Sequence, residues 1–195
     1  MKHRFRIPVS FQLLFWMTVA LGIGYPLAMT AFAQLLFPDK ANGSLVVIAG
    51  EVRGSRLLAQ EFDSPLYFHA RPSATNYGYV GSGGSNEAET NPALRDQLAK
   101  RSDDWRAIGA GKIPSDMLYA SASGLDPDIS LASALGQLDR VCAARSFGPE
   151  ATARLADLIR KMSSDAETII GPSRVDVVVL NAALATNPAF AFGAK

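Results

Sequence analysis

Residues capable of nucleophilic or metal chemistry are scarce in this sequence. Two histidines and one cysteine occur in 195 residues, too few for a tetrahedral zinc site without unusual carboxylate help. His69 stands between Phe68 and Ala70 on an expected strand, where a lone histidine more often makes a structural hydrogen bond. Cys142 lies on an expected helix, the ordinary setting of a buried inert thiol. These residue types predict no catalytic or metal-binding residue.

Four further patterns could bind an anion, activate a serine or pair two carboxylates. Gly111-Lys112 lacks the first glycine and the following Ser or Thr of a phosphate-binding loop. Ser123-Gly124 lacks the glycine that precedes the serine in a hydrolase elbow. The run 82–85 could form an anion-binding nest, although no Lys or Arg adjoins it. Asp126 and Asp128 are explained as helix caps. We therefore predict no cofactor bound directly by this chain.

A long uncharged stretch near the N-terminus predicts a membrane anchor. No Asp, Glu, Lys or Arg occurs between Arg6 and Asp39. About 20 apolar residues suffice to cross a bilayer as a helix. We therefore expect one transmembrane helix over residues 9–37, followed by a folded domain.

The charges around this stretch predict its orientation. Three basic residues and no acidic residue precede it, namely Lys2, Arg4 and Arg6. Basic residues beside a membrane span stay on the cytoplasmic side. We expect residues 1–8 to be a cytoplasmic tail and residues 39–195 to be a periplasmic domain. The rest of the chain then carries 16 basic and 18 acidic residues, and without a basic excess it is not expected to bind nucleic acid.

A cleaved signal peptide is the alternative to an anchor. Ala31-Phe32-Ala33 has the small-x-small form of a cleavage site. The apolar stretch before it exceeds the roughly 7–15 residues of a typical signal peptide core, which favours the anchor. Both interpretations export the same domain.

Small residues recur every four positions within the apolar stretch. Ala20, Gly24 and Ala28 share one helix face, and such spacing lets a second membrane helix approach closely. Tyr25 and Pro26 lie in the same region. We predict that these five residues contact a partner in the membrane, the alternative being that Gly and Ala are simply common in membrane helices.

The remaining chain predicts a mixed α/β domain. Apolar periodicity and turn residues place its elements. The expected elements are strands over 45–49 and 52–60, a turn-rich segment over 62–91, a helix from Asn91-Pro92 to about 108, an extended piece over 113–122, a helix from 126–128 to 145, a helix from 149, a β-branched run over 175–180 and a helix over 181–185.

Short motifs follow one another in a recognisable order along the chain. The residues singled out in them are Gly54-Ser55, Arg71-Pro72-Ser73, Ser82-Gly83-Gly84-Ser85-Asn86, Asn91-Pro92, Gly124-Leu125-Asp126, and Gln137 with Arg140, besides Tyr25-Pro26 in the apolar stretch and Leu180-Asn181 near the end. Each motif alone is weak, but together and in order they are specific. The chain resembles the KdpC family, the C subunit of the Kdp potassium-importing P-type ATPase, over nearly its whole length.

This resemblance implies a role in a bacterial inner-membrane complex. One partner forms the potassium pathway and another hydrolyses ATP with magnesium, and the surrounding lipid is a third contact. The C subunit has one transmembrane helix and is described as a catalytic chaperone that raises the ATP affinity of the pump subunit, and we expect it to be a non-catalytic accessory subunit with no catalytic residues of its own. Because ATP is bound in the cytoplasm, a periplasmic domain can transmit such an effect only indirectly. The motifs then serve as partner surfaces or as turn and cap structures.

Two other functions compete with this interpretation. A membrane-anchored periplasmic hydrolase would use His69 with a serine, since no other histidine lies beyond the apolar stretch. A free periplasmic binding protein would be released by cleavage after Ala33.

Overall fold

The structure is a computed structural model that describes residues 7–78, 80–107, 113–163 and 173–190. It separates into two units, Met1–Ser44 and Leu45–Lys195. The three basic residues of the expected cytoplasmic tail and the Gly111-Lys112 pair lie outside the described residues. Each unit is considered by itself.

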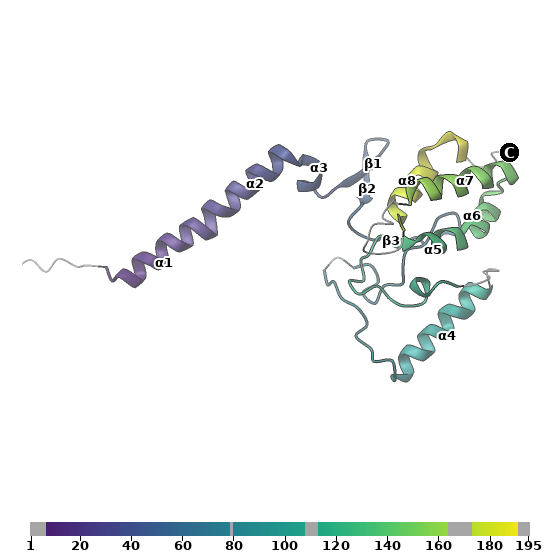
Figure 1. The fold of residues 1–195 in the computed structure, drawn as a ribbon, viewed down its shortest axis with the longest axis horizontal. Helices are drawn as coiled ribbons and strands as arrows, with labels where there is room; N and C mark the ends of the chain where they lie inside the picture. The colour runs from purple at the N-terminus through teal and green to yellow at the C-terminus, as the bar shows by residue number, and fades with distance from the viewer. Residues whose placement is uncertain (1–6, 79, 108–112, 164–172, 191–195) are drawn as a thin grey trace, which may run out of the picture. The chain divides into compact units, whose positions relative to one another are not determined.

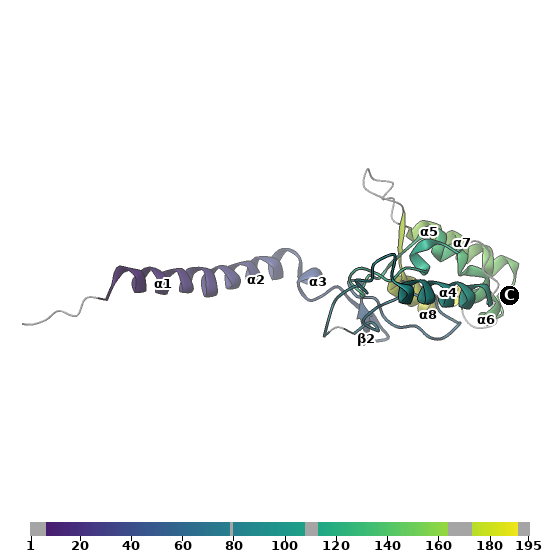
Figure 2. The same cartoon turned by 90° about the horizontal axis from the view of Figure 1, so that it is seen from below.

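The N-terminal unit is a single apolar helix followed by one short helical turn. Helix α1 (Val9–Val19) passes through a π-helical turn (Ala20–Gly24) into α2 (Tyr25–Leu36), and α3 (Pro38–Ala41) follows (Figures 1 and 2). The 28 residues of the apolar helix extend about 42 Å at 1.5 Å per residue, more than the ~30 Å hydrocarbon core of a bilayer. Its length and composition therefore suffice to span a membrane.

The π-helical turn has a local cause in the sequence. Pro26 has no N–H to donate, so the α-helical hydrogen-bond pattern is interrupted just before it. The widened turn Ala20–Gly24 lies at that interruption. The small residues predicted to contact a partner therefore lie on and directly after an irregular turn.

The C-terminal unit begins with an antiparallel hairpin. Strands β1 (Leu45–Ile48) and β2 (Glu51–Ser55) are joined by Ala49 and Gly50, both with positive φ. Two successive residues in this region are typical of the tight turns of hairpins. The predicted hairpin is confirmed, although its second strand ends at Ser55 and not at residue 60.

Short helices and one strand pair make up the rest of this unit. The elements are α4 (Pro92–Ala107), a 3₁₀ turn (Ser115–Met117), β3 (Asp128–Ser130), α5 (Leu131–Gly136), α6 (Leu138–Arg145), α7 (Pro149–Met162), β4 (Arg174–Asp176), α8 (Val177–Thr186) and a 3₁₀ turn (Pro188–Phe190). Helix α7 packs against α5 and α6, and β1 packs against α8 (Figure 1). The predicted fold class, one N-terminal apolar helix and a mixed α/β domain, is confirmed.

Two predicted element boundaries are wrong, and side-chain caps explain both. The helix expected from residues 126–128 begins at Leu131, because the Ser130 Oγ accepts a hydrogen bond from the Ser133 N–H at 3.1 Å. Residues Asp128–Ser130 instead pair with β4. The β-branched run after residue 175 turns helical, because the Asp176 carboxylate caps α8 by accepting from the Val179 N–H at 3.0 Å.

The extended piece expected over 113–122 contains the 3₁₀ turn Ser115–Met117 and no strand. Asp116 lies in that turn, and its carboxylate accepts hydrogen bonds from the Ser130 N–H and the Ser133 hydroxyl. Burial opposes ionisation, but these hydrogen bonds leave the pKa of Asp116 lower than usual. The turn therefore serves to hold the start of α5.

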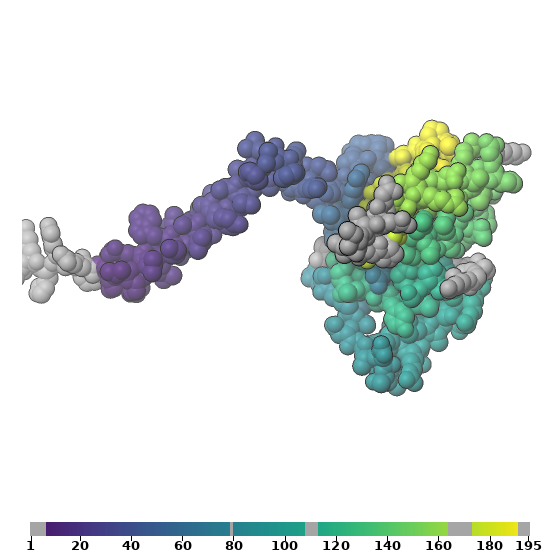
Figure 3. Space-filling view, in the orientation of Figure 1, coloured from purple at the N-terminus to yellow at the C-terminus, as the bar shows by residue number. Residues whose placement is uncertain are grey.

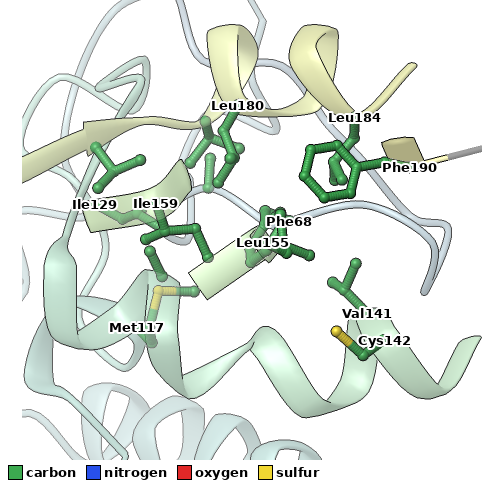
Figure 4. Close-up of a cluster of buried hydrophobic side chains, with 14 of the residues drawn as sticks. Phe68, Met117, Ile129, Val141, Cys142, Leu155, Ile159, Leu180, Leu184 and Phe190 are labelled. Carbon is green, nitrogen blue, oxygen red and sulfur yellow. The ribbon is translucent and has the colours of Figure 1, made fainter. Parts of the chain in front are cut away.

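The hydrophobic core of this unit lies between α6, α7, α8 and the segment around Phe68 (Figure 4). Leu155 and Ile159 project from one face of α7 and are fully buried, as is Leu180 of α8. Cys142 lies in the same core, and burial raises the pKa of its thiol. The prediction of a buried thiol is confirmed.

Candidate functional site

Two buried side-chain amides hold the backbone at Phe68 and His69. Asn181 accepts from the Phe68 N–H and donates to the Phe68 carbonyl, both at 2.9 Å. Gln137 accepts from the His69 N–H at 2.7 Å and donates to the His69 carbonyl at 3.0 Å. These are the hydrogen bonds that a neighbouring strand normally supplies. Gln137 and Asn181 are at most 3% exposed, so they serve the interior of the fold.

Two arginines complete this bracing. Arg140 donates to the carbonyls of Pro65 and Tyr67 at 3.0 and 2.9 Å, and also to the Gln137 amide oxygen at 2.9 Å. Burial lowers the pKa of Arg140 to about 10, which leaves it charged at neutral pH. Arg145 donates to the Leu66 carbonyl at 2.7 Å. Residues 65–69 are therefore fixed by side chains of α6 and α8.

Three segments that carry the predicted motifs hydrogen-bond to one another. We call them the motif loops, and they are residues 71–75, 82–84 and 121–126. The Ser73 hydroxyl donates to the Gly124 carbonyl at 2.7 Å. The Gly83 N–H and the Ser82 hydroxyl both donate to the Ser123 carbonyl, at 2.8 and 3.0 Å. Because the Gly83 N–H points at a carbonyl, it cannot contribute to the anion-binding nest considered for residues 82–85.

Two glycines of the motif loops, Gly84 and Gly124, lie in close approach to neighbouring segments. Gly124 has φ +70°, and a Cβ there would lie 2.6 Å from the Thr75 hydroxyl and 2.8 Å from the Gly83 carbonyl oxygen. A Cβ on Gly84 would lie 3.2 Å from the Ala122 carbonyl oxygen. Only a residue without a side chain fits at Gly124 without displacing its neighbours.

An ion pair closes the motif loops at one end. Arg71 donates to the Asp126 carboxylate at 3.1 Å, and both side chains are about one quarter exposed. The Ser121 N–H donates to the Pro72 carbonyl at 2.9 Å. Asp126 also accepts from the Asp128 N–H. The prediction that both aspartates cap a helix is wrong, since Asp126 anchors a loop and Asp128 lies in β3.

The other predicted motif residues have structural contacts of their own. A Cβ on Gly54 would lie 2.5 Å from the Gln60 amide, while the Ser55 Oγ accepts from the Leu57 N–H at 3.1 Å. The Leu125 carbonyl accepts from the Ala59 N–H at 2.9 Å, which joins the motif loops to the segment after the hairpin.

Near α4, the predicted cap is confirmed. Asn91 accepts from the Ala93 N–H at 3.0 Å, and Pro92 starts the helix. Asn86 adopts a left-handed conformation with φ 54°, and Ser85 lies in the same irregular segment.

His69 lines a cleft of about 460 Å³ with Arg101, Arg140, Tyr77 and Trp105. Its ring Nε2 lies 3.4 Å from the Ser64 carbonyl oxygen, a contact with backbone and not with a serine hydroxyl. Burial, and secondarily the charge of Arg140, lower the pKa of His69. Among the described residues, no group of three His, Cys, Asp or Glu side chains could hold a metal ion.

In the N-terminal unit, the five residues predicted to contact a partner are all solvent-exposed. Ala20 and Gly24 lie in the π-helical turn, and Tyr25, Pro26 and Ala28 lie in α2. A Cβ on Gly24 would lie 3.6 Å from the Val19 carbonyl oxygen, an ordinary contact distance. The helix itself therefore leaves room for a larger residue at this position.

The sequence motifs include Asn181 but do not indicate that Asn181 or Arg145 holds the backbone of residues 66–68. The available signal for Asn181 was its place as a lone polar amide inside an apolar run, α8, where an unpaired amide is costly. No local pattern distinguishes Arg145 from other arginines near a helix end.

Comparisons with known proteins agree with these motifs. The family described as KdpC, K⁺-transporting ATPase, c chain, matches residues 7–186. A potassium-transporting ATPase KdpC subunit of Paraburkholderia xenovorans is 44% identical over 191 residues, which cover 94% of this chain and 97% of the relative. The KdpC subunit of Serratia proteamaculans is 46% identical over 90% of this chain and 95% of its own length.

A third relative, the KdpC subunit of Acidobacterium capsulatum, is 46% identical over 84% of this chain and 88% of its own length. The matches include both the apolar helix and the α/β domain, since they span most of the sequence. The chain therefore belongs to the KdpC family of subunits of the potassium-transporting ATPase.

Proposed function

We propose that this chain is a non-catalytic accessory subunit that stabilises the assembly of the potassium-translocating and ATP-hydrolysing subunits of a potassium pump. The observation that carries the proposal is the family match over residues 7–186, which includes an apolar helix of 28 residues. A subunit with a helix of this kind can assemble with its partners inside the bilayer.

In this proposal the chain crosses the inner membrane once, with residues 1–8 in the cytoplasm and residues 39–195 in the periplasm. The basic residues before the apolar helix support this orientation. A reporter that is active only outside the cytoplasm, fused after Lys195, is expected to be active. If a reporter that is active only in the cytoplasm works at the same position, the orientation is wrong. Direct binding of nucleotide by this chain would then be the better explanation.

The chain itself binds no nucleotide in this proposal. A periplasmic domain cannot meet cytoplasmic ATP, so any increase in the ATP affinity of the pump subunit is transmitted by favouring one of its conformations. The proposed contact in the membrane consists of five residues in or after the π-helical turn, namely Ala20, Gly24, Tyr25, Pro26 and Ala28. The periplasmic domain covers the outer mouth of the potassium-translocating subunit.

The motif loops support a structural role within that domain. Their hydroxyls and N–H groups are bonded to one another, so these contacts shape the domain that a partner meets. Deleting the chain from the complex is expected to abolish growth at limiting potassium and to leave the other two subunits less stably associated in detergent. Undiminished growth and association would refute the accessory role.

A further inference from the structure

The outward face of the β1–β2 hairpin is apolar. Val47 and Val52 lie opposite each other in the antiparallel register, and their side chains are 57% and 60% exposed. Three further apolar side chains that are at least 40% exposed lie on β1 or directly after β2. We call this set the hairpin face, and it consists of Leu45, Val47, Val52, Leu57 and Leu58.

Strand β1 is apolar on its other face as well. Val46 and Ile48 line a hollow that Val178 and Ala182 of α8 also line, and Figure 3 shows the hairpin (blue) beside α8 (yellow). A strand covered on only one side normally alternates apolar and polar residues, whereas a strand covered on both sides is apolar throughout. The sequence of β1 therefore indicates a second cover over the hairpin face.

The hairpin face is hollowed. Leu45, Val52 and Leu58 line a groove of about 450 Å³, and Tyr77 and Leu125 form part of its wall. A groove of this kind accepts side chains of a protein segment, whereas a lipid surface is bound by protruding side chains. The shape therefore favours a protein as the cover.

The groove carries one acidic side chain, Glu61, on its wall. The hairpin face itself contains only leucine and valine. The nearest charged residues on β2, Glu51 and Arg53, pair with each other at 2.6 Å. A complementary segment is therefore mainly apolar, and an acidic residue in it would meet the like charge of Glu61.

The chain connection limits how far β1 can lie from the end of the apolar helix. Strand β1 begins after only eight residues, 37–44, beyond the end of the apolar helix at Leu36. Eight residues span at most roughly 29 Å when fully extended, and the helical turn α3 shortens that reach. A partner embedded in the same membrane is therefore within reach of the hairpin.

We infer that the hairpin face binds a mainly apolar segment of a membrane-embedded subunit of the potassium-transporting ATPase, at the surface of the membrane. This inference rests on the proposed function and specifies where the α/β domain meets its partner. The family consists of subunits of such an ATPase, which supplies a partner of this kind in the same membrane.

The first test is the double substitution Val47→Thr and Val52→Thr in the full chain. Threonine keeps the shape and the strand preference of valine and adds a hydroxyl. Co-purification with a tagged ATP-hydrolysing subunit is expected to weaken by about tenfold or more. Val80→Thr is the matched control, because Val80 is 95% exposed and outside the hairpin face. Equal retention of the double variant and the control would overturn the inference.

The second test does not depend on how the variants fold. A photo-crosslinking amino acid at position 47 of the intact complex is expected to form an adduct with a membrane-embedded subunit. An adduct with a second copy of this chain, or with lipid only, would overturn the inference. Whatever the two tests show, co-purification of the wild-type chain with the ATP-hydrolysing subunit remains consistent with the proposed function. If the wild-type chain does not co-purify, the proposed function itself is refuted.

Discussion

Replacement of Gln137 with methionine tests whether the buried amides determine the stability of the α/β domain. Gln137 is fully buried and bonds to the N–H and carbonyl of His69 and to the Arg140 guanidinium. Methionine has nearly the same volume and no comparable hydrogen-bonding group, so two buried backbone groups lose their partners. Each such group costs about 1–3 kcal/mol. We expect a loss of roughly 2–6 kcal/mol in the free energy of unfolding.

The loss is large against the 5–15 kcal/mol that hold a typical domain. At about 2–4 °C per kcal/mol for a domain of this size, the melting temperature of the full chain in detergent is expected to fall by at least about 4 °C. Near-ultraviolet circular dichroism and resistance to proteolysis measure this change. Gln97→Met is the matched control, since Gln97 is partly exposed and its bonds to Glu87 and Arg101 are both 3.3 Å long.

A second substitution at the same site separates hydrogen bonding from packing. Gln137→Glu keeps an acceptor for the His69 N–H and for Arg140 but cannot donate to the His69 carbonyl when ionised. We therefore expect its loss to be smaller than that of Gln137→Met at neutral pH. If the free energy of unfolding of Gln137→Met lies within about 1 kcal/mol of the wild-type value, the idea that the Gln137 amide takes the place of a neighbouring strand is refuted.

Three further outcomes follow from the glycines and the histidine. Gly124→Ala is expected to lower the free energy of unfolding by about 1–3 kcal/mol because Gly124 has a positive φ. Gly81→Ala is the control and should shift the melting temperature little, since nothing lies within 4 Å of a Cβ at that position. Equal shifts in melting temperature for the two variants would contradict the close-approach argument. Gly24→Leu should weaken co-purification with the potassium-translocating subunit and Gly22→Leu, off the small-residue face, should not; undiminished co-purification of Gly24→Leu removes that face as a contact. Burial lowers the pKa of His69 from its usual value of 6.5. As the pH falls below 6.5, the His69 imidazole therefore takes up a proton in the unfolded chain before it does so in the folded one, and the free energy of unfolding decreases. His69→Gln should reduce that decrease and leave growth at limiting potassium unchanged, whereas lost growth would favour the hydrolase.

Elements with strong local signals were predictable from the sequence. The apolar helix is marked by the absence of charge. The hairpin is marked by the β-branched run 45–49 and by the apolar residues that resume at Val52 after a glycine turn. Helix α4 is marked by the Asn91 cap and by Pro92 at its start. In each case the deciding contacts lie within a few residues of one another, so a local pattern is sufficient.

The starts of α5 and α8 were not predictable in the same way. Ser130 and Asp176 are the caps, but each also ends a strand, and the two strands pair with each other. In their register Ser130 lies opposite Arg174 and Asp128 opposite Asp176, which are 44 and 48 positions apart in the sequence. The β-branched residues Val177 and Val178 favour a strand, yet their burial in the core outweighs that preference. Long-range pairing and burial therefore set these boundaries.

The sequence identified the motif residues but not their connections. Ser73 and Gly124 are 51 residues apart, and Arg71 and Asp126 are 55 apart. Nothing local in the sequence relates one member of such a pair to the other. The motif order therefore indicated the family, while the structure is needed to distinguish bracing residues from surfaces that meet a partner.

The bracing of Phe68 and His69 also has a consequence for how the chain acquires its fold. A neighbouring strand supplies backbone hydrogen bonds whatever its side chains are. Here the hydrogen bonds of Phe68 and His69 depend instead on two side-chain amides that lie 113 and 68 positions further along the sequence. Since ribosomes make the N-terminal part first, Phe68 cannot bond to Asn181 until nearly the entire polypeptide has been synthesised. Truncation near the C-terminus therefore leaves the middle of the domain, far away in the sequence, without its support.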